Sequence, residues 1–411
     1  MYRPNLIKQA FHDSRRFLAK NWLSVIPVIQ IAITGSQGKT NTTQIVYRLL
    51  SKIRPTISTD IDLDTIYNVP ITALKIMPWT KYAVFELGID RKEEMDLHLQ
   101  IVKPRVAIVT GISPVHTDQE HLGSLANLIR EKRKLVESIP GNGVTILNGD
   151  DRIVREMASA SKAPIVYYGL GKNNHIRAED IKNDLKGVEF SIKIAGENSF
   201  TIKTRLIGSQ HTFNIMAAYA VYRYLGYTDL QYFKETVEAI KPLTGRMSLE
   251  KGPDQTNILD DSLRANPAST AFGLKTLSEI KYPDGRKIAV LCEMGELEKP
   301  VDEHKKIGRL IAGLNIDYLI SVGSLQRFTA DQAIRSGMDK NRVYAAANVI
   351  ECAKILKKII KKNDLLYFKG SRLKHIERVL MILRGDEVRC PLTSCPAYIH
   401  CSKCPRLRID N

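Results

Sequence analysis

A short glycine-bearing loop near the start of the chain carries residue types that bind phosphate. The apolar segment 31–33 leads into Thr-Gly-Ser-Gln-Gly-Lys-Thr at positions 34–40, and a helical pattern follows. Glycines let backbone N–H groups close around phosphate oxygens, and the N-terminus of the next helix adds partial positive charge. Lys39 would reach the β- and γ-phosphates of a nucleotide, and the Thr40 hydroxyl would bind Mg²⁺. We therefore predict nucleotide contacts at Gly35, Ser36, Gln37, Gly38, Lys39, Thr40 and Asn41.

This loop differs from the general P-loop, because Ile33 stands where that pattern has its first glycine. Nucleotide binding alone does not distinguish a ligase from a kinase or a GTPase, so further motifs must decide. They occur in this order: Glu86-Leu87-Gly88, Ser113-Pro114-Val115-His116, Lys132, His211 with Asn214, Gly245-Arg246, Asp260-Asp261, Glu293-Met294-Gly295-Glu296-Leu297 and Lys369-Gly370-Ser371-Arg372.

The ordered set resembles the Mur ligases and the related folylpolyglutamate synthetases over nearly all of residues 28–385. The resemblance implies an ATP-dependent ligase. A carboxylate would attack the γ-phosphate to form an acyl-phosphate, which an amine then opens, so the substrates are a small-molecule acid and amine. The last motifs are most similar to the cell-wall peptide ligases, which favours a muramyl-peptide-like acid and a role in peptidoglycan synthesis. Two alternatives are a glutamyl or amino-acid polymer ligase of the folylpolyglutamate type and a non-catalytic nucleotide-binding subunit.

The resemblance also implies roles for the metal-binding residues. Thr40 and Glu86 would hold a Mg²⁺ that bridges the nucleotide phosphates, since hard oxygen ligands suit this ion. His116 would hold a second Mg²⁺ nearer the acyl group. Lys132 lies at the position of a carbamylated lysine, whose new negative charge would help to hold that second ion. The alternative for Lys132 is an ordinary helix lysine.

Four further residues resemble contacts of the nucleotide. His211 and Asn214 match an ATP-contacting pair, although Thr212 and Gly111 replace asparagines that are usual in the family. Arg246 would reach the γ-phosphate and Asp261 the nucleotide, both from the last domain. For Asp261, capping of the helix that begins near Pro267 is an equal alternative. The implied catalytic set is Lys39, His116, Lys132 and Arg246.

Four of the six cysteines crowd into the end of the chain, at Cys390, Cys395, Cys401 and Cys404. Four thiolates can satisfy a tetrahedral Zn²⁺, although only the last pair has the usual two-residue spacing. The leading hypothesis is a structural Zn²⁺, with an iron–sulfur cluster second and unliganded thiols third. The other two, Cys292 and Cys352, stand in apolar surroundings and are predicted to be buried and inert.

The elements that must position these residues follow an α/β pattern. Short apolar runs predict strands at 28–34, 82–87, 105–110, 144–147 and 164–168, then at 256–260, 287–293, 317–322 and 364–369. Helices are predicted at 39–52, 124–138 and 211–225, and additional strands within 174–206. The fold class is therefore a P-loop domain with a mainly parallel sheet, followed by a Rossmann-like α/β domain.

The predicted domains are a helical segment at 1–27, a central ATP-binding domain at 28–243, a C-terminal domain at 244–389 and a cysteine-rich tail at 390–411. Ile7, Phe11, Leu18 and Trp22 predict an amphipathic first helix that packs on the central domain; a weak membrane-surface contact is the alternative. From the position of the loop at residue 34, we expect this chain to lack the uridine-binding domain of similar ligases. The acceptor's nucleotide would then be absent, bound otherwise or held by a partner subunit.

Composition limits the remaining possibilities. The 411 residues contain 61 Lys and Arg against 44 Asp and Glu, a net charge of +17. Without a recognisable nucleic-acid module, this excess fits phosphorylated ligands at least as well as nucleic acid. No apolar run is long enough to span a bilayer and no signal peptide is recognisable, so we expect a cytoplasmic protein with no integral membrane segment.

Overall fold

The computed structural model describes residues 6–61, 63–114, 117–295, 297–390, 392, 394, 395, 397, 400–404 and 407. The chain divides into two compact units. The first unit comprises residues 1–182, 189–204 and 210–240, and the second comprises 183–188, 205–209 and 241–411. The exact domain limits at 28, 244 and 390 stay predictions.

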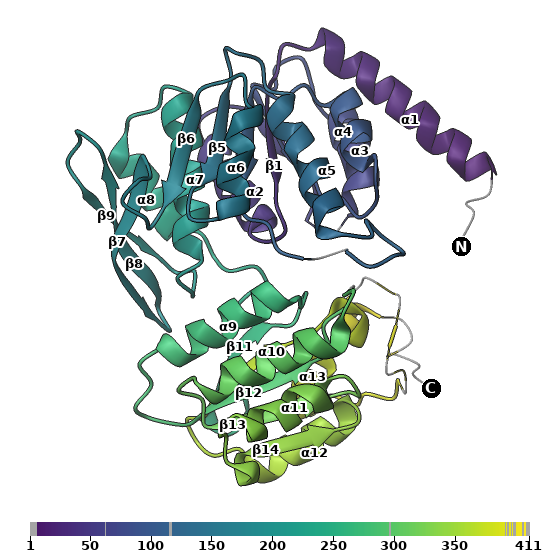
Figure 1. Cartoon of the computed structure of the whole chain (residues 1–411), viewed down its shortest axis with the longest axis vertical. Coiled ribbons are helices and arrows are strands. Elements are labelled where there is room, and N and C mark those ends of the chain that lie inside the picture. Colours follow the sequence, from purple (N-terminus) through teal and green to yellow (C-terminus); the bar gives the residue numbers. More distant parts are fainter. Residues whose placement is uncertain are drawn as a thin grey trace. The chain divides into compact units, whose positions relative to one another are not determined.

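The sheet of the first unit has the strand order β2-β3-β1-β4-β5-β6-β7-β8-β9 (Figure 1). Its pairs from β2 to β7 are parallel. Parallel strands covered by helices on both faces need continuous apolar runs, and all four residues of β4 are buried. The strands are β1 (Ile29–Thr34), β2 (Thr56–Ser58), β3 (Tyr82–Glu86), β4 (Val106–Val109), β5 (Val144–Asn148), β6 (Ile165–Gly169), β7 (Ile176–Asp184), β8 (Gly187–Ile194) and β9 (Phe200–Thr204).

Helices cover both faces of this sheet (Figure 1). One face carries α2 (Lys39–Ser51), α7 (His211–Tyr224) and α8 (Leu230–Glu238). The other carries α3 (Thr65–Leu74), α4 (Glu94–Ile101), α5 (Leu125–Glu137), α6 (Arg152–Glu156) and the short 3-10 helix η1 (Met157–Ala160).

The first helix, α1 (Leu6–Val25), lies outside α3 and α4 (Figure 1). The helix itself was predicted, but the face assigned to it is wrong. Phe11 and Leu18 are both 57% exposed, whereas Ala19 and Leu23 pack into the core. Trp22 is partly buried, and its indole N–H donates to the carbonyl of Ile76 at 2.7 Å. The buried face of α1 thus contains Ala19 and Leu23, each one residue after Leu18 and Trp22, which had been predicted to pack.

The second unit contains a six-stranded sheet of order β10-β11-β15-β12-β13-β14. Only β10 is antiparallel to its neighbour. The strands are β10 (Ser248–Lys251), β11 (Asn257–Asp261), β12 (Lys287–Cys292), β13 (Tyr318–Val322), β14 (Val343–Ala346) and β15 (Leu365–Lys369). This arrangement confirms the predicted α/β class with a second, Rossmann-like sheet.

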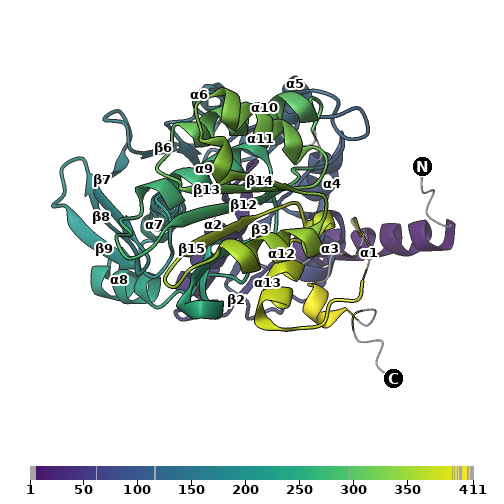
Figure 2. The same ribbon diagram turned by 90° about the horizontal axis from the view of Figure 1, so that it is seen from below.

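Helices α9 (Pro267–Glu279), α10 (Pro300–Ala312) and α11 (Gln326–Arg335) pack on one face of this sheet, and α12 (Val349–Ile359) and α13 (Glu377–Arg384) on the other (Figure 2). Short 3-10 helices complete the unit: η2 (Pro253–Gln255), η3 (Lys340–Arg342), η4 (Arg372–Lys374) and η5 (Cys401–Lys403). Cys292 and Cys352 are buried in the core between α12, α13 and the sheet, as predicted.

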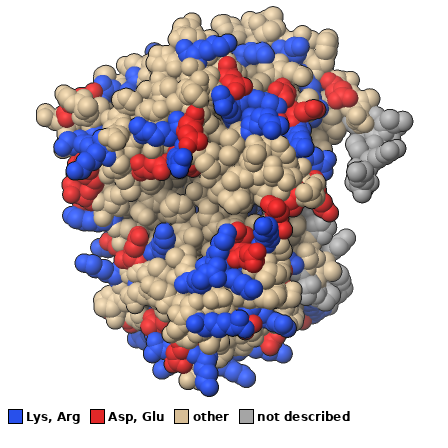
Figure 3. Space-filling view, viewed as in Figure 1, with Lys and Arg blue, Asp and Glu red and all other residues tan. Residues whose placement is uncertain are grey.

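Lys and Arg side chains are scattered among Asp and Glu on the face in Figure 3, with no single basic stripe on that face. None of the helices in the described part of the chain has both the length and the hydropathy to cross a bilayer.

Candidate active site

The predicted phosphate loop connects β1 to α2 at the carboxyl edge of the first sheet. Gly35 and Gly38 have φ angles of +144° and +79°, which side chains rarely adopt. A Cβ on Gly35 would lie 2.1 Å from the Thr110 hydroxyl oxygen, so a close approach also requires glycine there. Lys39 turns back over the loop, and its Nζ donates to the carbonyl of Gly35 at 2.9 Å.

A second segment, which follows β4, holds this loop in place. The Ser36 N–H donates to the carbonyl of Gly111 at 2.7 Å, and the Ser36 hydroxyl donates to the carbonyl of Ser113 at 2.9 Å. The Thr110 hydroxyl donates to the Gln37 carbonyl. Thr110 was missed from the sequence, because a lone threonine after a strand has no distinctive pattern.

The predicted Mg²⁺ ligands Thr40 and Glu86 lie together. Thr40 begins α2 and Glu86 ends β3, and the Thr40 hydroxyl donates to Glu86 Oε1 at 3.2 Å. The neighbouring strand ends of a parallel sheet meet at one edge, which explains how residues 46 positions apart become partners. A hydroxyl and a carboxylate beside a phosphate loop fit the donor set that Mg²⁺ prefers.

Lys132 projects from α5 into the same region. Its side chain is 2% exposed, and its Nζ lies 3.5 Å from the hydroxyl oxygen of Thr34 at the end of β1. Burial, and then the nearby charge of Lys39, hold the pKa of Lys132 well below its usual range. A lower pKa increases the share of neutral, nucleophilic amine, which is the state that carbamylation by CO₂ requires.

His211 and Asn214 lie at the start of α7, beside the loop. Asn214 Oδ1 accepts a hydrogen bond from the Thr42 hydroxyl at 3.2 Å, and Asn214 Nδ2 lies 3.4 Å from His211 Nδ1. A Cβ on Gly38 would approach Asn214 Oδ1 to 2.9 Å. Burial lowers the pKa of His211 to about 4, so this imidazole is neutral near pH 7.

A buried histidine supports the Glu-Leu-Gly turn and was missed from the sequence. His98 Nε2 lies 2.9 Å from the carbonyl of Gly88, which makes Nε2 the protonated nitrogen. The Thr65 hydroxyl donates to the same carbonyl at 2.9 Å. Burial lowers the pKa of His98 to about 4. His98 therefore fixes the backbone two residues after Glu86 without carrying charge.

Asp261, in the second unit, ends β11 and forms an ion pair with the buried Lys369. Its Oδ2 accepts from Lys369 Nζ at 2.7 Å and from the Tyr367 hydroxyl at 3.0 Å. The alternative that Asp261 caps α9 is wrong, because Asn266 caps that helix with Ser269 in a capping box. Arg246 follows Gly245, whose φ is +72°, and its side chain is partly exposed.

A cavity of about 410 Å³, with both polar and apolar lining residues, lies at the carboxyl edge of the second sheet, after β12 and β13. Glu293 lines it and accepts from Lys374 at 2.8 Å, from the Ser324 hydroxyl at 3.1 Å and from the Leu325 N–H at 2.9 Å. These donors outweigh the effect of burial and lower the pKa of Glu293. His304 is fully buried, bonded to Met294 N–H and the Pro300 carbonyl, and is structural.

His116, the predicted ligand of the second Mg²⁺, lies outside the described residues. Its preceding neighbours Ser113 and Pro114 are described, and Ser113 contacts the phosphate loop. Asn41 lies in the first turn of α2 and is partly exposed.

Comparison with known families decides the ancestry of this arrangement. Residues 33–222 match the model of the Mur ligase middle domain, and residues 245–372 match that of the Mur ligase glutamate ligase domain. The chain belongs to the Mur ligase family. It is thus an ATP-dependent ligase that joins an acid to an amine, as the motifs predicted.

Two curated relatives and two solved structures illustrate how far the similarity of this Mur ligase extends. UDP-N-acetylmuramoyl-tripeptide–D-alanyl-D-alanine ligase of Bacillus subtilis is 28% identical over 92% of this chain and 79% of its own. The Escherichia coli protein of the same name is 27% identical over 88% and 78%. The structure of MurF from Acinetobacter baumannii superposes with a TM-score of 0.81 at 26% identity, over 91% of this chain and 80% of that one. MurF from Thermotoga maritima in complex with ADP shares the fold, with a TM-score of 0.79 at 22% identity over 91% and 83%.

Proposed function

We propose that this Mur ligase joins a D-alanyl-D-alanine-like amine to the terminal carboxylate of a muramyl-tripeptide-like acid. The proposal rests on the names of the relatives that the chain resembles along both domains. A glutamyl ligase of the folylpolyglutamate type is the weaker alternative, because folylpolyglutamate synthase from Mycobacterium tuberculosis shares only the fold, at 17% identity.

The observation that carries the proposed chemistry is that four side chains from two helices and one strand lie at one edge of the sheet. They are Lys39 and Thr40 of α2, Glu86 of β3 and Lys132 of α5. Lys39 would leave the Gly35 carbonyl to neutralise the β- and γ-phosphate oxygens of ATP. Backbone N–H groups of residues 35–40 and the N-terminus of α2 would hold the remaining phosphate charge. Phosphoryl transfer requires chiefly this positioning and charge neutralisation.

In the first step a carboxylate oxygen of the acid forms a bond to the γ-phosphorus, while the bond from that phosphorus to the bridging oxygen breaks and ADP leaves. In the second step the amine nitrogen attacks the acyl carbon. The carbon–oxygen bond to phosphate breaks, phosphate leaves with the electron pair, and the amine loses a proton. We assign Arg246 to the γ-phosphate and Asp261 to the nucleotide as proposals, together with His211 and Asn214.

Thr40 and Glu86 would hold one Mg²⁺, and His116 with carbamylated Lys132 a second. The ions would supply charge neutralisation at the transferred phosphoryl group. The buried position and lowered pKa of Lys132 support carbamylation, since a neutral amine nitrogen can attack CO₂ and release a proton. The cytoplasmic location and a partner subunit that holds the acceptor nucleotide belong to the same proposal. Zn²⁺ in the tail is a separate proposal, and no catalytic step depends on it.

Phosphate release from ATP tests the function. We expect release only when both a UDP-muramyl-tripeptide and D-alanyl-D-alanine are present, with the ligated product detected by mass spectrometry. The same assay with a folate and glutamate, and with each substrate alone, provides the comparison. Turnover with folate and glutamate would favour the alternative, and release that depends on no acid–amine pair would contradict the ligase assignment.

A further inference from the structure

The cysteine-rich tail folds against the C-terminal domain, where its backbone bonds to Leu373 and Arg378. Cys390, Cys395, Cys401 and Cys404 all line one cavity of about 20 Å³, and His375 lines it too. A cavity of this size holds about one water molecule or one ion. None of the four cysteines forms a disulfide, so four thiols and an imidazole surround a space for a single small guest.

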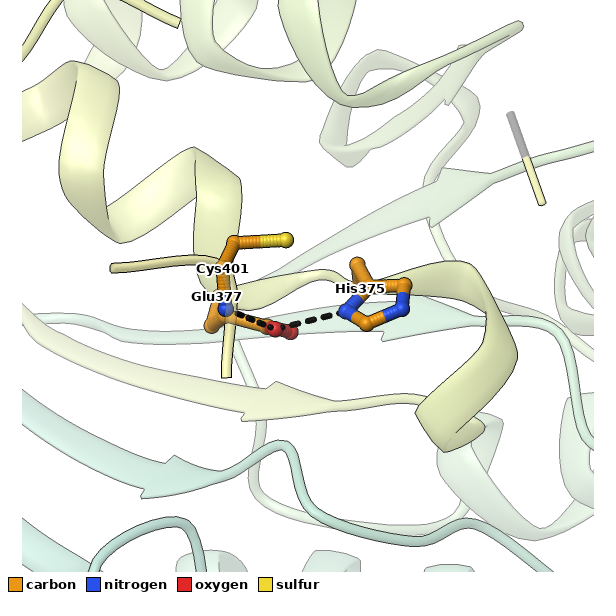
Figure 4. Close-up of side chains that lie close together, drawn as sticks. All are labelled: His375, Glu377 and Cys401. Atoms are coloured by element: carbon orange, nitrogen blue, oxygen red, sulfur yellow. Dashed lines mark hydrogen bonds and ion pairs between the residues drawn. The ribbon is translucent and has the colours of Figure 1, made fainter. Parts of the chain in front are cut away.

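A buried histidine–glutamate pair adjoins this cavity, and its histidine, His375, is one of the lining residues. His375 Nδ1 and Glu377 Oε1 are 2.8 Å apart, and each residue is 1% exposed. Donor atoms of His375, Glu377 and Cys401 all lie within 4.8 Å of one another (Figure 4). The second ring nitrogen of His375, Nε2, is also buried and has no hydrogen-bond partner in the described part of the chain. Burial of an unsatisfied polar atom is costly, which marks the cluster as one that expects a ligand.

The domain already holds the backbone of the tail at three of the four cysteines. The Cys395 N–H donates to the carbonyl of Leu373 at 2.8 Å. The Cys401 N–H donates to Glu377 Oε1 at 3.3 Å (Figure 4), and Arg378 donates to the carbonyl of Cys390 at 3.3 Å. Backbone contacts with the domain therefore hold three of the four cysteines around the cavity that all four line.

We propose that this cluster binds one thiophilic divalent cation of the Zn²⁺ class. The ligands are the thiolates of Cys390, Cys395, Cys401 and Cys404, which lose their protons when the ion binds and give a closed tetrahedral set. Glu377 and His375 are positioning residues: Glu377 Oε1 accepts from the Cys401 N–H at 3.3 Å, and His375 Nδ1, 2.8 Å from the same oxygen, holds that carboxylate in place. Such outer partners orient the ligands of a metal site. Of the four described thiols, that of Cys401 lies within 4.8 Å of the pair, so binding would draw the other three thiolates towards it.

The ion would also hold part of the wall of the larger, 410 Å³ cavity of the C-terminal domain. Cys390 and Leu392 line that cavity together with Glu293 and Lys374, and Cys390 lines the small cavity as well. A cation that fixes Cys390 would therefore fix one wall of the larger cavity.

Metal and thiol stoichiometry of the full chain, produced without an affinity tag and purified without chelator, tests the proposal. We expect one zinc per chain by plasma mass spectrometry, with one zinc released for every four tail thiolates that a mercurial modifies. The wild-type measurement decides even if variants fail to fold. Substoichiometric zinc with all six thiols reactive, iron with inorganic sulfide, or disulfides detected by mass would each overturn it.

Variants separate ligands from positioning residues. Cys395→Ser and Cys404→Ser should lose the zinc, whereas Cys352→Ala, which removes a buried thiol elsewhere, should retain one per chain. His375→Asn should keep the one-to-one stoichiometry but bind zinc about 10- to 100-fold more weakly in competition with a chromophoric chelator. Loss of zinc in His375→Asn with retention in Cys395→Ser would overturn the proposed ligand set.

Discussion

Lys132 is a buried amine whose Nζ lies 3.5 Å from the Thr34 hydroxyl oxygen and, among the described residues, forms no ion pair with a carboxylate. Burial, and then Lys39, lower its pKa, which favours the neutral amine that carbamylation by CO₂ requires. We predict that Lys132→Ala lowers the rate of phosphate release by about 100-fold or more. Removal of one preorganised charged or polar group from an active site typically lowers kcat by this factor. Short carboxylic acids such as acetate or propionate should restore part of this rate, because they replace the missing carbamate.

Arg133→Ala is the matched control on the same helix, since Arg133 is exposed and pairs only with Glu137 at 3.1 Å in the described part of the chain. It should keep the wild-type rate and should not respond to added acids. An active Lys132→Ala, or a dead one that no acid restores, would contradict carbamylation. The ligase assignment would survive either result, because that rests on the substrate-dependent release of phosphate.

His98 and His211 predict an acid-labile first unit. Burial lowers the pKa of both from 6.5 to about 4, so the unfolded chain takes up these protons at higher pH than the folded chain. Stability is therefore full above pH 6.5 and is lost as the pH falls toward 4. Each histidine contributes about 3 kcal/mol to this loss. Urea unfolding at pH 7.5 and 5 should show a smaller pH dependence for His98→Gln than for wild type.

At the scale of elements, the loop between β1 and α2 depends on a close approach to the segment after β4. We predict that Gly35→Ala abolishes nucleotide binding measured by calorimetry, because a Cβ there meets the Thr110 hydroxyl at 2.1 Å. Gly196→Ala is the control: Gly196 also has a positive φ, of +79°, but nothing lies within 4 Å of its Cβ position. If both variants bind nucleotide equally weakly, backbone strain and not the close approach is the cause.

The ion pair between Asp261 and Lys369 joins the neighbouring strands β11 and β15. Removal of one partner of such a pair leaves an uncompensated charge. We predict that Asp261→Asn lowers the free energy of unfolding of the second unit by about 3 kcal/mol. The double variant Asp261→Asn/Lys369→Met should recover part of it. If the double variant recovers stability but not activity, Asp261 also acts on the nucleotide.

Most strands could be predicted from sequence because their residues are apolar without interruption. β4 and β12, for example, are buried at every position, and a short apolar run of this kind is typical of a central parallel strand. The short edge strands β2 and β14 were missed, since no residue of β2 is fully buried and an edge needs no apolar run. Helix α3 was missed because Pro70 lies inside it. Local pattern also gave the wrong face for α1, whose burial depends on the surface it meets.

At the scale of the whole molecule, the site also contains residues that a local sequence pattern predicts and residues that depend on tertiary packing. Residues in one motif, such as Lys39 and Thr40, are predictable because the chain itself brings them together. The Thr110 contact and the burial of Lys132 depend on which strands become neighbours, which no local pattern states. His375 and Glu377 form no motif in the sequence, because their role depends on the tail that packs against α13.

Two units with separate sheets and cores should unfold in two transitions that respond to different ligands. The protein has two tryptophans, Trp22 and Trp79, and both belong to the first unit. Their fluorescence therefore reports the first unit, whereas calorimetry reports both. ADP with Mg²⁺ at 100 times its dissociation constant should stabilise the first unit, whose unfolding the fluorescence follows, by about 2.7 kcal/mol, because the phosphate loop lies in that unit.

Removal of the proposed zinc should lower the temperature of only that calorimetric transition which fluorescence does not follow. A chelator that shifts the tryptophan signal as strongly as the second transition would show that the units unfold as one, and the tail would then stabilise the entire ligase.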